Sequence, residues 1–333
     1  IHANLNTKKR AKNFKLIFLF SFILGLGLGN HYAILISTLP ALIFLIFQSE
    51  VKKILNPRGI LFSLALLLLG VSIYLYLPIR SSIHPVFNWG NPANLKQFFS
   101  SVLALESVQK IGLNSGTDFW SKISGIAQLL SEQLGVLAII IASLGFIHLL
   151  KLNKKIFWFS IILILGNCLI TALLTDEFIS DNPDLHGYLI PSLIALILGF
   201  FAGVLFIFQS LKILLSKKVF SLYFQKTAYS IAVVLIIVIC LTPLYNFYPK
   251  ANLSKNNFPF NYAMSVISGL PRNSVVFLDN PNLDFILRGL QYGDGIRPDL
   301  IILNRSFLAA NWYFLQEKNK NLQIFQGINK FRS

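Results

Sequence analysis

At Tyr76-Leu77-Pro78-Ile79-Arg80 a long apolar run ends, and the aromatic, proline-bearing segment His84-Pro85-Val86-Phe87-Asn88-Trp89-Gly90-Asn91-Pro92 soon follows. Proline lacks a backbone N–H and crowds the preceding turn, so Pro78 is expected to end a helix. Tyrosine and tryptophan rings favour the lipid–water interface, and Tyr76 and Trp89 lie here. The stretch therefore predicts a membrane exit into a substrate-facing loop.

The composition indicates a membrane protein. The chain has 333 residues, of which 55% are hydrophobic and 13% charged, which is too apolar for a soluble globular domain. The formal charge of +16 would suggest a nucleic-acid partner in a soluble protein, but the lysines gather in short segments between apolar runs. That pattern is typical of cytoplasmic loops, so membrane lipid is expected as a partner and nucleic acid is not.

The chain is predicted to be a polytopic α-helical membrane protein with a transmembrane region over residues 1–248. Its predicted spans cover residues 16–30, 32–47, 60–78, 134–150, 156–174, 188–209 and 228–245. Basic residues flank both ends of the run 16–47, so this run predicts a tight hairpin that turns near Asn30-His31; one long kinked helix is the alternative. This topology places the loop 79–132, with interfacial helices over 95–105 and 123–134, outside.

The C-terminal segment, residues 249–333, is predicted to be an outward-facing α/β domain. Its pattern alternates helices with short β-branched strands, expected at 261–268, 274–278, 283–292 and 300–303, with a further helix from Asn311. Two strands are too few for a well-buried sheet. Because the chain also begins at Ile1 and shows no signal peptide, it is expected to be a piece of a longer protein.

Two polar residues at the predicted hairpin are candidate binding residues. Asn30 and His31 would lie at membrane depth, where a polar group costs free energy unless it faces a cavity or a partner. A neutral His31 hydrogen-bonded at a helix end is an equally good interpretation. The preceding Gly25-Leu26-Gly27-Leu28-Gly29 lacks the strand of a dinucleotide site and indicates close helix packing instead.

Arg80 and Trp89 are candidates at the outer surface. Arginine can bind a phosphate or carboxylate bidentately, and the Trp89 ring can stack on a sugar. The alternatives are an arginine that snorkels to the interface and an interfacial aromatic anchor.

The loop 176–186 carries a further group of candidates, because it concentrates acidic residues in a chain that has 13 of them. Asp181 and His186 could contribute to a substrate site there, with a carboxylate as general base. A solvated outer loop is the alternative. No metal site is expected, since the spacing does not define one. Asp279, Asp284, Asp294 and Asp299 are interpreted as turn and capping residues.

Several landmarks along the whole chain resemble one family. They are Gly25 to His31 with Leu39-Pro40, Tyr76 to Arg80, Asn88 to Pro92, Tyr188 to Ser192, Ala263 to Pro271, Gly295 to Asp299, and Asn311-Trp312-Tyr313. The family is a large bacterial group of polytopic membrane proteins long labelled as of unknown function. An animal relative in the endoplasmic reticulum is a protein O-mannosyltransferase that acts on immunoglobulin-like (IPT) domains of receptors.

The resemblance implies a glycosyltransferase of the C-type membrane superfamily in the bacterial inner membrane. Such an enzyme transfers a sugar, here expected to be mannose, from a polyprenyl-phosphate donor to a hydroxyl of a protein or glycan, with no cofactor. Arg80 and His31 would suit the donor phosphate. The usual catalytic acid lies in a first outer loop that this chain lacks, so the catalytic residue is unknown. Residues 278–284 also depart from an Asp-richer, glycine-bearing run in relatives, so the resemblance assigns no ligand role there.

Two other classes of function are open. A non-enzymatic membrane scaffold or envelope-assembly component would use the outer domain to bind partners. A transporter is less favoured, because the predicted spans lack intramembrane charge pairs and a repeated pair of broken helices.

Overall fold

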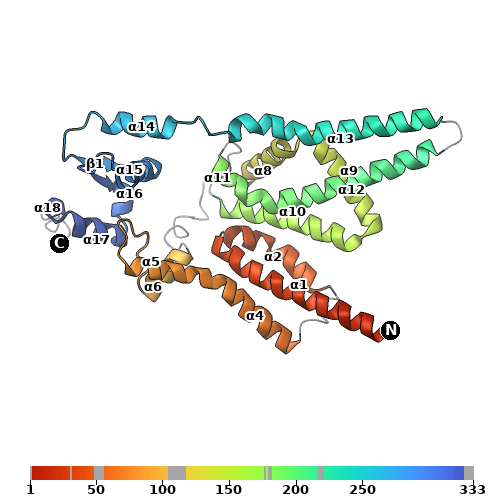
Figure 1. Ribbon diagram of the computed structural model, residues 1–333, viewed down its shortest axis with the longest axis horizontal. Helices are drawn as coiled ribbons and strands as arrows, with labels where there is room; N and C mark the ends of the chain where they lie inside the picture. The colour runs from red at the N-terminus through yellow and green to blue at the C-terminus, as the bar shows by residue number, and fades with distance from the viewer. Residues whose placement is uncertain are drawn as a thin grey trace. The chain divides into compact units, whose positions relative to one another are not determined.

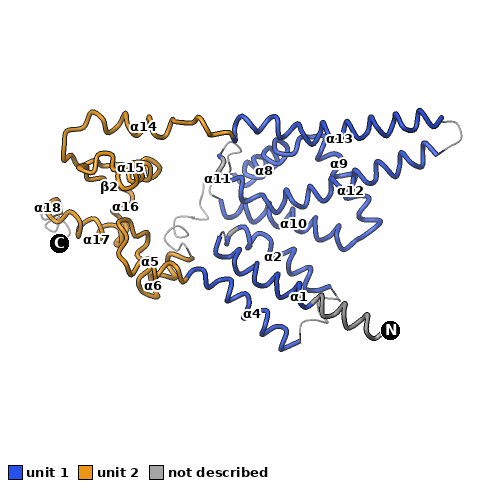
Figure 2. Tube along the Cα trace, in the orientation of Figure 1, with its two compact units in different colours: residues 1–74, 108–251 blue, residues 75–107, 252–333 orange. Residues whose placement is uncertain are grey.

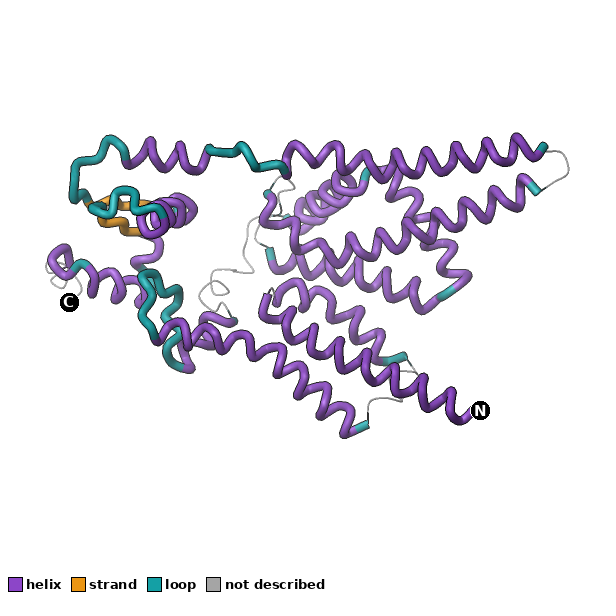
Figure 3. Tube along the Cα trace, in the orientation of Figure 1, coloured by secondary structure: helices purple, strands orange, loops and turns teal. Residues whose placement is uncertain are grey.

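The computed structural model describes residues 2–30, 32–48, 56–103, 118–175, 178, 182–216 and 221–325. The described chain is mostly helical, with one pair of short strands (Figure 3). It divides into two compact units, which are coloured separately in Figure 2. The first, the helical unit, comprises residues 1–74 and 108–251; the second, the α/β unit, comprises residues 75–107 and 252–333. The second unit thus includes residues that the sequence placed with the transmembrane region.

The helical unit begins with three packed helices (Figure 1), namely α1 (His2–Asn30), α2 (Tyr32–Ile46) and α4 (Pro57–Val71). A Cβ added to Gly27 would lie 3.3 Å from the Leu35 side chain, whereas residues this far apart in one continuous helix would be separated by about 12 Å. The chain therefore turns back between α1 and α2, as the hairpin interpretation requires.

Glycines bring α1 and α4 into close contact. A Cβ on Gly25 would overlap the Leu67 carbonyl oxygen, and one on Gly70 would lie 2.7 Å from the Leu26 nitrogen. Small residues allow backbones to approach in this way. The glycines of the run 25–29 thus serve helix packing, as predicted.

The prediction that a helix ends at Pro78 is wrong. A 3₁₀ segment, η1 (Ser72–Leu75), follows α4, and α5 (Tyr76–Ser82) then extends the helix beyond the proline. Pro78 lies in the first turn of α5, where its missing N–H costs little. The disturbance caused by the proline thus falls upstream of it, in η1, and the helix continues past Arg80.

The rest of the helical unit follows the order α8 (Phe119–Leu134), α9 (Val136–Leu152), α10 (Lys154–Leu174), α11 (Pro183–His186), η2 (Gly187–Leu189), α12 (Ile190–Leu215) and α13 (Leu222–Ala251). Gly135, with a φ of +81°, separates α8 from α9, which differ in direction by 98°. Helices α9 and α12 contact each other through glycines. A Cβ on Gly145 would overlap the carbonyl oxygen of Gly199, and a Cβ on Gly203 would overlap the carbonyl oxygen of Ile141.

A buried polar cluster joins α2, α10 and the start of α12. The Asn167 amide donates hydrogen bonds to Ser37 Oγ at 2.7 Å and to the Tyr188 carbonyl at 2.8 Å. The Ser192 hydroxyl donates to Asn167 Oδ1 at 2.6 Å. Because Asn167 and Ser192 are fully buried, their polar groups are paired inside the helical unit rather than hydrated.

Four described helical stretches are long and apolar enough to cross a membrane: Pro57–Ser82, Lys154–Leu174, Gly187–Leu215 and Leu222–Ala251. The bent pair α8 and α9 together meets the same criterion, while the apolar parts of α1 and α2 are shorter. No residue in the apolar window of α13 is buried within the chain. Such a surface needs an apolar environment, which indicates a membrane-embedded helical protein.

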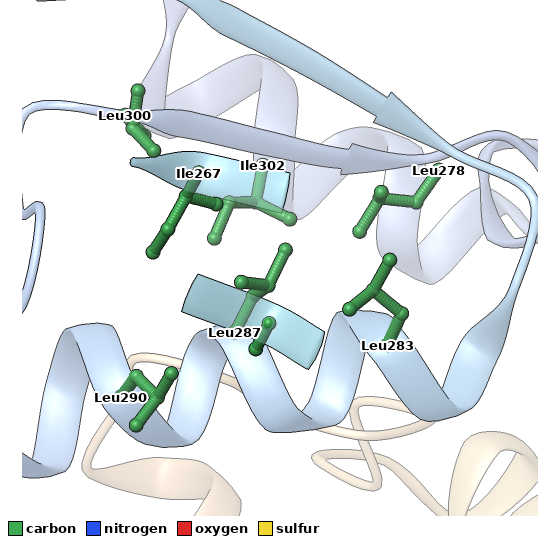
Figure 4. Packing of buried hydrophobic residues seen from close by; sticks show 8 residues of the cluster. Ile267, Leu278, Leu283, Leu287, Leu290, Leu300 and Ile302 are labelled. Carbon is green, nitrogen blue, oxygen red and sulfur yellow. The ribbon is translucent and has the colours of Figure 1, made fainter. Parts of the chain in front are cut away.

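The α/β unit contains α6 (Leu95–Val102), α14 (Phe258–Ile267), β1 (Val275–Leu278), α15 (Pro281–Gly293), β2 (Ile301–Asn304), α16 (Arg305–Leu308), α17 (Asn311–Lys320) and α18 (Leu322–Phe325). Strands β1 and β2 pair in parallel, with Val275 opposite Ile301 and Leu278 opposite Asn304. Helix α15 is the crossover between them. Leu283 and Leu287 point from it toward the strands (Figure 4), and Leu290 belongs to the same buried cluster. This small core supports the loops described below.

Arg297 fixes the turn that leads into β2. It adopts a φ of +51°, and its guanidinium donates to the Ile267 and Leu270 carbonyls at 2.7 and 3.1 Å, at the end of α14. It also makes two hydrogen bonds of 2.9 Å to Asp299, which in turn accepts the Asn273 N–H. These hydrogen bonds lower the pKa of Asp299 below its usual range, and the bond from Arg297 has the largest effect. Asp299 is therefore a turn residue, as predicted.

We predict that substitution of Gly145 by Ala destabilises the protein by about 1–3 kcal/mol, because the added methyl group overpacks the contact between α9 and α12. Gly289, which has open space around its Cβ position in α15, is the matched control. Its substitution by Ala is expected to be neutral or stabilising, since alanine favours a helix. Thermal unfolding in detergent measures both, and equal midpoints for the two variants would contradict the packing argument.

We also predict a contribution of Asp299 to stability at neutral pH. Its pKa is lower in the folded chain than the ~3.9 expected in an unfolded one. The stabilisation is therefore present above about pH 4 and lost as the pH falls and the carboxylate is protonated. Asp299→Asn should lower the stability of the fold at pH 7. It should also reduce the loss of stability that the parent shows as the pH falls from 5 to 2. Denaturant titrations at several pH values test this, and a variant with an unchanged acid decline would refute it.

Candidate functional site

A hydrogen-bonded loop follows α5 in the α/β unit. The side chains of Asn88 and Asn91 hold the buried Ser81, since Asn88 Nδ2 donates to Ser81 Oγ at 2.9 Å and to Asn91 Oδ1 at 3.0 Å. Gly90 has a φ of +69°, and a Cβ there would overlap the Ser101 hydroxyl. The sequence Asn88-Trp89-Gly90-Asn91 thus builds a fixed turn next to Arg80.

Helix α17 holds the same loop from its other side. The Asn88 N–H donates to Gln316 Oε1 at 2.9 Å, and Lys320 Nζ donates to the Val86 carbonyl. Desolvation lowers the pKa of Lys320 from its ordinary value. Two segments more than 200 residues apart in the sequence are therefore joined within one unit.

Trp89 belongs to an aromatic cluster that spacing along the sequence does not reveal. Its ring lies 5.2 Å from that of Phe307 and 5.2 Å from that of Trp312, measured between centroids, and 5.9 Å from that of Phe285. Phe87, which is half-buried, contacts the rings of Phe285 and Trp312. Trp312 is buried, but 52% of Trp89 is exposed. The loop therefore presents one rigidly supported indole at the surface.

Arg288 lies beneath this cluster and is almost completely buried. Its Nε–H is shared between the two carboxylate oxygens of Asp284, at 3.0 and 3.1 Å, and its Nη1 donates to Glu317 Oε1 at 3.3 Å. Its guanidinium carbon lies 4.9 Å from the centre of the Phe87 ring. Burial raises the pKa of Asp284, although the charge of Arg288 opposes this shift. Asp284 is therefore an ion-pair residue, and its interpretation as a turn or capping residue is wrong.

Arg288 and Tyr313 also satisfy the outer edge of β2. Arg288 Nη2 donates to the Ile302 carbonyl at 2.9 Å and to the Tyr313 hydroxyl at 2.6 Å, and that hydroxyl accepts the Asn304 N–H at 2.9 Å. Desolvation raises the pKa of Tyr313 to about 12, so its hydroxyl remains protonated. In the sequence, this ion pair is indicated by the spacing of Asp284 and Arg288, which lie four residues apart on a predicted helix. The sequence interpretation of Asp284 as a turn or capping residue overlooked this spacing.

Arg80 lies exposed in the last turn of α5. Near it an open groove of about 650 Å³ runs between α5 and the start of α6. Leu75, Pro78, Leu95 and Phe98 give this groove an apolar lining, and Lys96 adds a cation. An amphiphile with an acidic head group fits this chemistry, because the groove can cover a hydrocarbon while Lys96 supplies a cation for the anion. Arg80 does not line the groove; it follows the lining residue Pro78 by two positions on the same helix.

The structure places the remaining candidates as follows. Asn30 is the exposed last residue of α1, and His186 is the half-buried last residue of α11, both in the helical unit. The Asn167 cluster brings η2, which directly follows His186, beside α2. His31 and Asp181 lie outside the described residues. Among the residues that are described, no group of three or more His, Cys, Asp or Glu side chains could hold a metal ion.

We predict that the buried Arg288 network stabilises the α/β unit strongly. Arg288→Ala would leave Asp284 as a buried charge without its partner and Glu317 with the longer 3.8 Å contact to Lys320, at a cost of about 3–5 kcal/mol. The matched control is Arg305→Ala, because Arg305 pairs with Asp279 at 3.5 Å with both side chains largely exposed, and exposed pairs contribute little. Limited proteolysis and thermal unfolding distinguish the two variants. Similar unfolding of both would show that the buried network has no special role.

Comparisons with known proteins support one distant relationship. The chain is 23% identical over 339 aligned residues to the protein O-mannosyl-transferase tmem260 of Dictyostelium discoideum. The alignment covers 94% of this chain and 40% of that protein. No family model matches the chain, and no solved structure matches it. The similarity runs through both units, and it relates this chain distantly to the tmem260 protein.

Proposed function

We propose that the chain is part of a membrane glycosyltransferase of the C-type superfamily. The enzyme transfers a hexose, expected to be mannose, from a polyprenyl-phosphate donor to a hydroxyl of a protein or an envelope glycan. The reaction takes place on the outer face of a bacterial inner membrane. The similarity to a protein O-mannosyl-transferase over 94% of the chain is the observation that supports this proposal. Since the chain spans 40% of that relative, the whole reaction is assigned to the full-length polypeptide.

Arg80 is the proposed contact for the donor phosphate. A lipid-linked donor approaches sideways from the bilayer, so its phosphate needs a cation close to the membrane surface. Arg80 lies near the end of the apolar stretch Pro57–Ser82, two residues after Pro78, which lines a groove together with Lys96. A guanidinium there would bind the phosphate bidentately and stabilise the charge that grows on it as the bond to the sugar breaks.

Sugar transfer also needs a group that accepts the proton of the acceptor hydroxyl. As the acceptor oxygen forms its bond to the anomeric carbon, the phosphate leaves with the bonding electrons and the proton passes to a carboxylate. The family resemblance implies an acid of the first outer loop for this role, and no residue described above is proposed for it. Asn30, His31, Asp181 and His186 remain candidates for contacts to donor or acceptor.

We predict that Arg80→Ala reduces sugar transfer about 100-fold, the usual effect of removing a group that stabilises developing charge. The assay supplies radiolabelled polyprenyl-phosphate mannose to membranes that contain the full-length protein. Arg58→Ala is the matched control, because Arg58 is exposed at the other end of the same stretch. The two arginines thus lie near opposite ends of one apolar stretch.

The outcomes separate three interpretations of the site. Loss of transfer in Arg80→Ala alone, with equal membrane insertion of both variants, supports the phosphate contact. Equal losses in both variants would mean that Arg80 is an interfacial anchor. Absence of transfer by the parent from mannose-type and glucose-type donors would refute the enzyme and favour a membrane scaffold that binds envelope partners.

A further inference from the structure

The exposed Trp89 ring lies at a particular place in the α/β unit. It contacts Phe285 of α15 and Phe307 of α16. Helix α15 begins three residues after the last residue of β1, and α16 begins at the residue that follows β2. The carboxyl ends of both strands therefore lie beside the aromatic cluster. In open sheets with parallel strands, ligands bind outside this end, where the loops that follow the strands converge.

A charged pair follows the same strand ends. Asp279 comes directly after β1, and Arg305 comes directly after β2. Because Leu278 is opposite Asn304 in the sheet, Asp279 and Arg305 each follow one member of the last strand pair. The Asp279 carboxylate and the Arg305 Nε atom are 3.5 Å apart, and the two side chains are 72% and 77% exposed. At this separation and exposure the pair contributes little to stability. Both groups keep free capacity for hydrogen bonds to a ligand.

The support around Trp89 reduces the entropic cost of binding. The loop is held by the side chains of Asn88 and Asn91 and by Gln316, and the indole rests on Phe285, Phe307 and Trp312. A ring fixed in this way does not need to be ordered when a ligand arrives. It is also amphipathic, so it can cover an apolar surface while its N–H remains available.

The chemistry of the ligand follows from these two features. A pyranose ring has a face of C–H groups that can cover an indole, and a rim of hydroxyls that can bind a carboxylate and a guanidinium together. A purely apolar partner would remove water from Asp279 and Arg305 without providing hydrogen bonds in its place. The negative charge of Asp279 would disfavour a phosphate. We propose that Trp89, Phe285 and Phe307, with Asp279 and Arg305, form a subsite for a hexose ring of an acceptor glycan.

This inference rests on the proposed function in the choice of the sugar and in its role as acceptor, and its test requires no transfer. The purified full-length protein in detergent is titrated with mannobiose, and binding is followed by saturation-transfer NMR. Trp89→Ala should weaken binding at least about tenfold, which corresponds to ~1.4 kcal/mol. Trp120→Ala is the matched control, because Trp120 is 71% exposed in the helical unit, and it should bind like the parent.

Further variants keep the test decisive if Trp89→Ala fails to fold. Trp89→Phe keeps an aromatic ring and should bind several-fold more weakly than the parent, and the exposed Asp279→Asn should also weaken binding without loss of stability. Unchanged binding in folded Trp89 and Asp279 variants would overturn the subsite. Absence of binding by the parent would overturn it as well, even if sugar transfer is observed. Trp89-dependent binding of an unglycosylated acceptor peptide in place of mannobiose would overturn the assignment to a sugar.

Discussion

The α/β unit depends on one buried arginine. Arg288 joins four segments, because its guanidinium bonds Asp284 on its own helix, the Ile302 carbonyl on β2 and Glu317 on α17, and lies against the Phe87 ring. A lone buried charge would be costly, so these partners must all be in place together. The same contacts cover the outer edge of a two-stranded sheet that would otherwise expose unpaired backbone groups. A small core is thereby joined to the loop that bears the candidate site.

In the helical unit the corresponding constraint is close backbone contact. Glycines at positions 25, 70, 145, 199 and 203 allow helices to approach to distances that a side chain would forbid. Asn167 then supplies hydrogen bonds to α2 and to the segment before α12. Since apolar side chains gain nothing by leaving lipid for one another, such packing and polar contacts specify which helices become neighbours.

The two proposals for the α/β unit concern different chemical parts of one reaction. The end of α5 carries the exposed Arg80, and the groove by α5 is lined by Lys96 among apolar residues, so cations lie near an apolar surface, as a lipid-linked phosphate requires. Trp89 offers a flat, supported ring beside charged groups, as a sugar requires. The turn formed by Ser81, Asn88 and Asn91 connects these two surfaces, so their relative positions are fixed by hydrogen bonds rather than left to a mobile loop.

The sequence alone determined the helical membrane class and the places of the C-terminal elements, since hydropathy, basic clusters and the alternation of helix with strand are local signals. It also indicated the packing role of the glycines after residue 24 and singled out Arg80 and Trp89. Only the tertiary structure revealed that the helix continues past Pro78. The 3₁₀ turn Ser72–Leu75 precedes it, so Pro78 lies in the first turn of a new helix, where its missing N–H leaves no hydrogen bond unmade. Only the tertiary structure joined the loop 84–92 to α17 and buried Arg288 among acids. Those contacts link residues about 30 to more than 200 positions apart, and no local pattern specifies such pairs.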